Sequence, residues 1–238
     1  MNIFTSAFVW LFSPERLEGS NAILPRLGEH LVYTFVSLLI AAVIAVPLGY
    51  LIGHTGKGRD IAVGITGAAR ALPSFGLILL LVAIFQAINP LQLNKPLTVF
   101  ISLVILGIPS VLAGAYAGLE AVDRRTIDAA RAVGMTEWQI LVKVEIPLGL
   151  PLLVSGLRAA TIQIVATATL AAYIGLGGFG FYIFQGLPLG RYDEMLGGAI
   201  LVALLALAID GVLAFVQKAV TPRALVATRT SKLRTRST

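Results

Sequence analysis

The sequence lacks cysteine and carries little charge. None of its 238 residues is Cys, and only 13% are Asp, Glu, Lys or Arg. The first absence excludes disulfide bonds and thiolate metal sites, and the second leaves about half the charge of an ordinary soluble domain. His30 and His54 are isolated, and no H-E-x-x-H motif or P-loop is present. The sequence therefore predicts a chain that is not an enzyme and that holds no metal or cofactor.

Long apolar runs occupy most of the chain, and 57% of the residues are hydrophobic. A helix that crosses a hydrocarbon layer of about 30 Å needs about 20 such residues. Five spans are predicted, at residues 31–53, 61–88, 98–119, 152–174 and 195–220. The second is the weakest, because Gly, Ala and Arg70 dilute its first half. The sequence thus predicts an all-α integral membrane protein of about five helices.

The distribution of Lys and Arg along the chain predicts how the protein is oriented in the membrane. Lys and Arg collect on the cytoplasmic side of membrane proteins, and twelve of the 18 basic residues share one side if residues 120–147 are cytoplasmic. These are Lys57, Arg59, Arg124, Arg125, Arg131, Lys143, Lys218, Arg223, Arg229, Lys232, Arg234 and Arg236. We therefore expect segment 1–30 outside the cell and the basic tail 221–238 inside it. This topology accounts for the net charge of +6 without a nucleic-acid partner.

The charged insert at 120–147 is punctuated like two short helices. Arg124, Asp128 and Arg131 recur at helical spacing, with Ile127, Ala130 and Val133 on another face. Gly134 is suited to end this helix in the left-handed conformation. Thr136 and Gln139 then form a capping box that begins a second helix. The simplest interpretation is that these are two solvated helices without a binding role, as any cytoplasmic loop can hold.

The spacing within this insert resembles the EAA loop of permease subunits of binding-protein-dependent ABC importers. Because that loop couples the permease to an ATPase, residues 120–147 are named the coupling loop from here on. The matching positions are Asp128, Ala129, Ala130, Gly134, Val144, Ile146 and Pro147. Asp replaces Glu at the first position, and Val and Ile replace Ile and Leu near the last. The resemblance covers about residues 25–220 and implies a type I importer permease fold like that of the methionine importer, with residues 31–220 as the transmembrane permease domain.

The same resemblance implies partners. In that family the loop forms coupling helices that dock in a groove of the ATPase subunit, so ATP and Mg²⁺ belong to a separate ATPase dimer. It also implies a second permease, alike or related, and an extracytoplasmic substrate-binding protein. The stretch ATATLAAYIGLGGFG, 166–180, with ALPSFGL, 71–77, is similar to the osmoprotectant branch, which imports glycine betaine, carnitine, choline or related quaternary amines. A permease for methionine or another amino acid is the alternative.

Four residues are assigned to a translocation path: Thr167, Thr169, Tyr173 and Asp210. An ionisable residue inside a span is a functional candidate by default, and Asp210 meets that description. A packing role for Asp210, paired with Arg70 or Arg158, is the alternative. The small residues of the fourth span, including both threonines, permit close helix contact, so they line either the path or a subunit interface.

GLGGFG, 175–180, fits a dinucleotide-binding fingerprint by spacing alone. That fingerprint needs a preceding strand and a βαβ unit, whereas here a membrane span precedes it. We expect the glycines to break the chain and begin a short re-entrant or interfacial segment. Its aromatic residues are expected at headgroup depth rather than in a cage for a quaternary amine. They are Phe179, Phe181, Tyr182, Phe184 and Tyr192.

Overall fold

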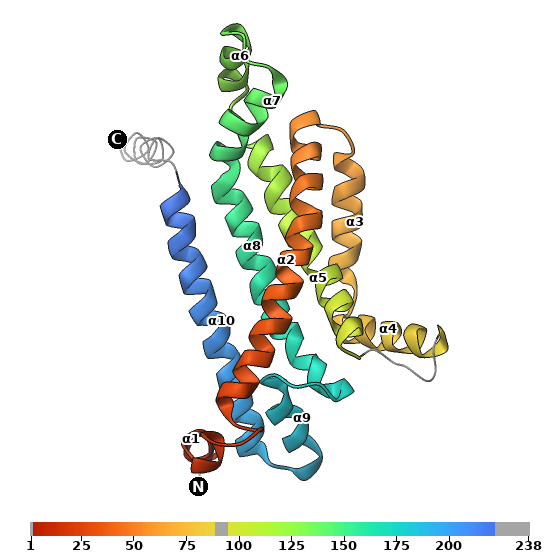
Figure 1. The fold of residues 1–238 in the computed structure, drawn as a ribbon, viewed down its shortest axis with the longest axis vertical. Helices are drawn as coiled ribbons and strands as arrows, with labels where there is room; N and C mark the ends of the chain where they lie inside the picture. Colours follow the sequence, from red (N-terminus) through yellow and green to blue (C-terminus); the bar gives the residue numbers. More distant parts are fainter. Residues whose placement is uncertain (1, 89–94, 222–238) are drawn as a thin grey trace.

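The structure is a computed structural model that describes residues 2–88 and 95–221. Within those ranges every regular element is a helix (Figure 1). In chain order they are α1 (Ile3–Leu11), η1 (Pro14–Arg16), α2 (Ile23–Thr55), α3 (Arg59–Ala71), α4 (Ser74–Ile88), α5 (Lys95–Glu120), α6 (Arg124–Ala132), α7 (Glu137–Ile140), η2 (Leu141–Glu145), α8 (Ile146–Ala168), η3 (Thr169–Ile174), α9 (Gly180–Leu189) and α10 (Tyr192–Val220). Apart from Thr221, the predicted basic tail 221–238 lies outside the described residues.

The centre of the bundle is formed by α2, α5 and α8, which pack along most of their length (Figure 1). α5 is the most enclosed, with fourteen buried residues, because α2, α3 and α8 all pack against it. α10 packs on α8 and α9 at the edge. This arrangement places the coupling loop at one end of the bundle and α1 and α9 at the other (Figure 1).

Glycine pairs bring α5 and α8 into close contact. A Cβ on Gly114 would lie 2.8 Å from the Cα of Gly156, and a Cβ on Gly118 would lie 2.6 Å from the carbonyl oxygen of Gly149. These neighbours are backbone atoms, which cannot rotate away as a side chain can. The two helices therefore cross at a distance that only glycine permits, as small residues allow in membrane bundles.

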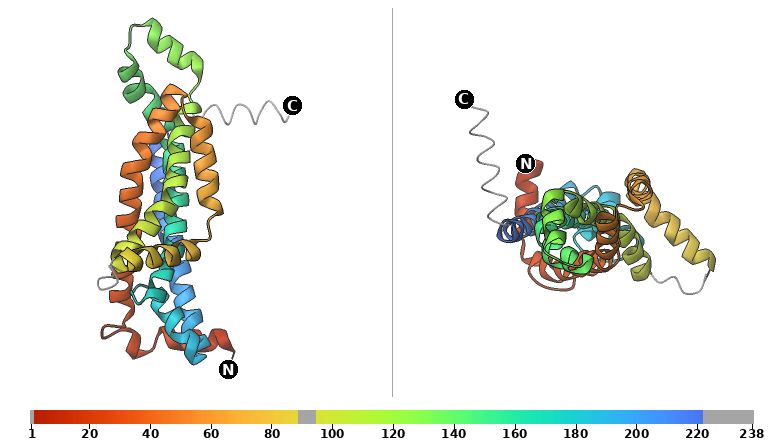
Figure 2. Two further views of the ribbon diagram at one scale, coloured as in Figure 1. Left: turned by 90° about the vertical axis from the view of Figure 1, so that its right-hand side faces the viewer. Right: turned by 90° about the horizontal axis from the view of Figure 1, so that it is seen from above.

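Of the five predicted spans, residues 61–88 are the one that does not form a single continuous helix. The structure divides it into α3 and α4, whose axes make an angle of 89°, and α4 projects away from the bundle (Figures 1 and 2). Leu72 is extended, with φ −69° and ψ 127°, as expected of a residue that precedes proline. Pro73 thus explains where the helix stops, although its position alone does not give the angle.

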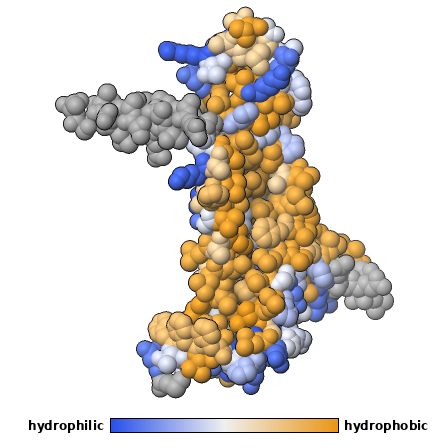
Figure 3. Space-filling model, turned by 60° about the vertical axis from the view of Figure 1, so that its left-hand side comes forward, coloured by the Kyte–Doolittle hydropathy of each residue, from blue (hydrophilic) through white to orange (hydrophobic). Residues whose placement is uncertain are grey.

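The other four predicted spans correspond to continuous helices that are longer than expected. α2, α5, the run Glu137–Ile174 and α10 are each long and apolar enough to cross a membrane, and α3 with α4 gives a fifth if the bent pair is one span. Hydrophobic side chains cover the middle of the molecule, and hydrophilic side chains gather at its two ends (Figure 3). Such an apolar band is what a bilayer requires of the surface that faces it.

Candidate functional site

The coupling loop folds as the sequence predicts, as helix, glycine break and capped helix. Asp123 caps α6 by accepting a hydrogen bond from the backbone N–H of Arg125. Gly134 adopts the left-handed conformation, with φ +85°. Thr136 and Gln139 then cap α7 reciprocally, each side chain bonding the other's backbone N–H. These local signals define a loop with two helical arms and one fixed bend.

A small hydrophobic core makes the coupling loop a unit of its own. Val122, Ile127, Ala130 and Ile140 are buried against one another, with Met135, Val144 and Leu148 packed around them. Because this core joins α6, α7 and the start of α8, the two arms cannot rotate independently. The loop is therefore suited to move as a rigid body.

The residues that match the EAA loop differ in how far they are exposed. Asp128, Ala129 and Gly134 are exposed, Ala130 is buried, and Val144, Ile146 and Pro147 are half-buried. The sequence predicts Val133 on the same helix face as Ile127 and Ala130. In the structure α6 ends at Ala132, one residue earlier, and the side chain of Val133 is 79% exposed.

Three large apolar side chains stand exposed on the coupling loop, a feature that was not predicted from the sequence. Trp138 is 71% exposed on α7, Val133 lies beside the glycine bend, and Val142 is 41% exposed in η2. Exposed apolar side chains that form one patch, rather than standing singly, are typical of a protein-contact surface. In the sequence, this exposed surface could have been recognised from an aromatic residue in the first turn of a short polar helix.

The coupling loop joins a span without a flexible linker. α7 continues through the π-helical turn η2 directly into α8. Single π turns inside helices are often found at functional sites. Pro147 is the second residue of α8 and follows this turn. A displacement of α7 must therefore be carried into α8.

The predicted path residues do not form one cluster. Thr167 is buried on α8, whereas Thr169 and Tyr173 lie in η3. Tyr173 is 53% exposed and makes edge contacts with the rings of Phe75 and Phe184. The structure thus places Tyr173 beside α4 and α9.

Asp210 lies elsewhere, on α10. Its two carboxylate oxygens each accept a hydrogen bond of 2.9 Å from the guanidinium of Arg158, which the sequence analysis had offered as an alternative partner. Arg158 also donates to Gln217 at 2.6 Å. Arg158 precedes Thr169 by about 16 Å along α8 at 1.5 Å per residue. The structure therefore joins Asp210 to α8 through Arg158, apart from the threonines.

At the opposite end of the bundle, residues 175–190, here named the α9 segment, are held by the start of α2. Gly175 and Gly178 both have φ of +83°. The segment runs from η3 into the helix α9, so it is not the strand-to-helix turn of a dinucleotide site. Glu29 accepts a hydrogen bond of 2.7 Å from the backbone N–H of Gly178. The glycines therefore allow the chain to turn back against α2.

The aromatic residues of the α9 segment are not all at the surface, contrary to the expectation of an interfacial belt. Phe179 and Tyr182 are buried with Trp10, while Tyr192 is 64% exposed. The Tyr182 hydroxyl donates to the carbonyl oxygen of Asn21 at 2.9 Å. Burial raises the pKa of Tyr182 to about 12, so the phenol remains neutral at physiological pH. These rings anchor α1 and α9 to the bundle.

A cavity of about 510 Å³ opens between α2, η3 and α9. Arg26, Glu29, Tyr33, Phe181, Phe184 and Gln185 contribute to its lining. Arg26 lies 3.8 Å above the ring centroid of Phe181 and 2.9 Å from the carboxylate of Glu29. The aromatic face of Phe181 is thus already covered by the protein's own cation, which argues against an open aromatic cage there.

The fold and its loop define a class: a multi-spanning membrane component of a transport system. Residues 45–226 match the family described as "Binding-protein-dependent transport system inner membrane component". The chain belongs to this family.

Relatives and solved structures agree with this assignment. The chain is 33% identical over 207 residues to the glycine betaine/carnitine/choline transport system permease protein OpuCB of Bacillus subtilis, covering 87% of this chain and 92% of that protein. It is 34% identical to the carnitine transport permease protein OpuCB of Listeria monocytogenes, with coverage of 87% and 92%. An inward-facing structure of the MetNI methionine ABC transporter matches with TM-score 0.72 and 25% identity, over 84% of this chain and 96% of that one. The predicted methionine-importer-permease-like fold is confirmed.

Proposed function

We propose that this chain is the transmembrane subunit of an ABC importer for glycine betaine, carnitine, choline or related quaternary amines. The observation that carries the proposal is the identity of 33–34% to permeases named for these compounds, along nearly the whole chain. ATP hydrolysis would then reside on a partner ATPase dimer with its own Mg²⁺. The chain itself would act without catalysis or cofactor.

The proposed mechanism uses the coupling loop as a lever. With the loop in the cytoplasm and the amino terminus outside, closure of the ATPase dimer displaces α6 and α7, and the continuous α7–η2–α8 connection carries the movement into the bundle. Substrate delivered by an extracytoplasmic binding protein passes between this permease and a second one. Thr167, Thr169 and Tyr173 remain proposed path residues, whereas the pairing of Asp210 with Arg158 favours a packing role for that carboxylate.

An importer for methionine or another amino acid is the second candidate, favoured by the TM-score of 0.72 to MetNI. Uptake of labelled glycine betaine in an importer-deficient host, with choline, carnitine and methionine as competitors, separates the two. ATP-dependent uptake that betaine-like compounds suppress supports the osmoprotectant proposal. Uptake that methionine alone suppresses replaces it with the second candidate.

Trp138→Ala is expected to weaken docking of the ATPase. A buried aromatic anchor contributes about 2 kcal/mol or more at an interface, so we expect an affinity loss of about 30-fold. Titration of the purified ATPase against the permease in nanodiscs measures it. Leu187→Ala is the control, because this leucine is 58% exposed at the opposite end of the bundle. Unchanged affinity of Trp138→Ala would remove α7 from the docking surface.

A further inference from the structure

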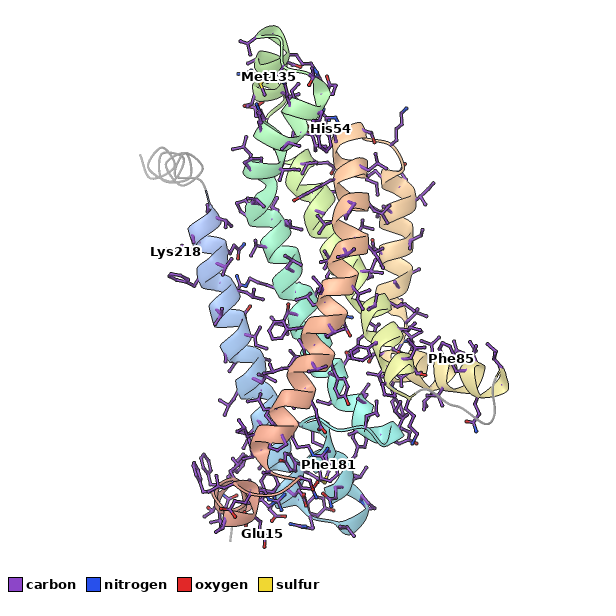
Figure 4. The ribbon with its side chains drawn as sticks, in the orientation of Figure 1. Glu15, His54, Phe85, Met135, Phe181 and Lys218 are labelled. Atoms are coloured by element: carbon purple, nitrogen blue, oxygen red, sulfur yellow. The ribbon has the colours of Figure 1, made fainter. Side chains whose placement is uncertain are left out.

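Both histidines of the chain lie on α2, one near each end, and each contacts a different part of the proposed machinery. His54 is in the last turn of α2, beside the coupling loop (Figure 4). His30 is near the beginning of α2, beside the α9 segment. At 1.5 Å per residue, they are separated by about 36 Å. α2 thus touches the coupling loop at one end of the bundle and the α9 segment at the other.

The contact at the loop end involves a buried carboxylate. Nδ1 of His54 is hydrogen-bonded to the Glu145 carboxylate, and Nε2 lies 3.7 Å from Glu137. The side chain of Glu145, the last residue of η2, is only 4% exposed. A buried carboxylate is costly unless it is paired, so separating Glu145 from His54 is unfavourable. α2 is therefore held to the turn through which α7 enters α8.

The same contact reaches α6. Arg131 binds both oxygens of Glu137, at 2.8 and 3.0 Å, and lies 3.4 Å from Asp128. A line of polar contacts thus runs from α6 through α7 to the end of α2. These outer pairs are exposed and individually weak, so the buried contact of Glu145 is the one that fixes the geometry.

The contact at the other end fixes the backbone of the α9 segment. His30 is fully buried. Its Nδ1 accepts from the backbone N–H of Phe179 at 3.2 Å, which leaves Nε2 as the donor to the carbonyl oxygen of Val165 at 3.0 Å. The preceding residue, Glu29, accepts from Gly178. Two successive side chains of α2 therefore hold two successive peptide groups of the α9 segment.

Between these ends α2 is one continuous helix, with Pro47 inside it, and its buried face is narrow. That face consists of small or polar residues: His30, Thr34, Ser37, Ala41, Ala45, Gly49 and Gly53. A Cβ on Gly53 would lie 2.8 Å from the carbonyl oxygen of Tyr116 on α5. The helix is thus seated closely on α5, and larger side chains beside this face, among them Leu38, Val46 and Tyr50, pack into the core that it shares with α5 and α8. A continuous helix held in this way carries a displacement along its length as a rigid element.

We propose that α2 links the coupling loop to the α9 segment, with His54 and His30 as the positioning residues at its two ends. The inference rests on the proposed function, because it assumes that an ATPase moves the loop. A displacement of η2 pulls on His54, α2 follows, and His30 with Glu29 shifts residues 178–179. α2 therefore adds a second route to the one through α8.

The absence of cysteine allows a direct test. The complete importer is reconstituted in liposomes with partner subunits from which any cysteines have been removed, and Leu187→Cys, on the exposed face of α9, gives this chain a single thiol. We expect its maleimide-labelling rate to change at least threefold between nucleotide-free and ATP-vanadate-trapped states. In His54→Ala this change is expected to be lost, and substrate imported per ATP hydrolysed is expected to fall at least tenfold.

The matched control is Thr55→Ala, because that exposed hydroxyl bonds within α2 and the turn after it, where it donates to Leu51 and accepts from the backbone N–H of Lys57. His54→Asn retains a donor near the Nδ1 position and should restore part of the response. If His54→Ala does not fold, Glu145→Met tests the same contact, because it removes the carboxylate and keeps a side chain of similar length. A full response in the folded His54→Ala or Glu145→Met importer overturns the link alone, provided the parent transports betaine. A parent that shows neither uptake nor a labelling change overturns the proposed function, and the link with it.

Discussion

Asp210→Ala should reduce the amount of folded permease recovered from membranes by about half or more, because it leaves the guanidinium of Arg158 without its carboxylate inside the apolar band. The carboxylate binds Arg158 through two hydrogen bonds of 2.9 Å. Gln217 would remain as a neutral partner of Arg158, which cannot replace the lost charge. Size-exclusion chromatography of detergent-extracted protein and its thermal melting curve measure the effect.

A paired replacement provides the control. Asp210→Leu combined with Arg158→Leu removes both charges, and such replacements are often neutral when the new side chains pack well. We therefore expect the double variant to be recovered in greater amount than Asp210→Leu or Arg158→Leu alone. If these two single variants accumulate like the parent, the ion pair makes no contribution to folding, and its role must be sought in transport.

Gly156→Val is expected to destabilise the bundle by about 3 kcal/mol, at the upper end of what overpacking costs. A Cβ at this position would lie 2.7 Å from the carbonyl oxygen of Ser110 and 2.8 Å from the Cα of Gly114. Relief of this overlap requires α5 and α8 to separate, and these helices form the centre of the fold. Unfolding in a denaturing detergent titration measures the loss.

Gly211→Val is the matched substitution for this measurement. Gly211 is also inside a membrane-spanning helix, but a Cβ there would meet nothing within 4 Å. The variant should unfold like the parent. Equal destabilisation by both substitutions would show that valine in these helices, rather than the close approach of α5 and α8, is responsible.

The parts of the structure that the sequence predicts best are those with local signals. Gly134, Thr136 and Gln139 lie within six residues, so the glycine break and the capping box are readable without the rest of the fold. The four continuous spans are similarly local, since each depends only on the length of its apolar run.

The parts that the sequence did not predict depend on distant residues. The contact of His54 with Glu145 joins positions 91 residues apart, and that of Glu29 with Gly178 joins positions 149 apart. Neither polar pair follows a periodic pattern. Pro73 marks the end of α3, but the 89° angle to α4 depends on how both helices pack on α5. The partner of Asp210 could be narrowed to two arginines, because few charges lie within the spans.

The Arg158–Asp210 pair also bears on how α10 settles against the rest of the bundle during folding. α10 is apolar on nearly all sides and packs on the bundle at its edge, so hydrophobicity alone would allow it to slide or rotate against α8. Asp210 is its only acidic residue beyond the first turn, and it meets Arg158 at one depth and one rotation. Together with the hydrogen bond from Gln217 to the carbonyl oxygen of Pro151, the ion pair favours one register of α10 on α8, in the way that a single polar residue fixes the alignment of a coiled coil.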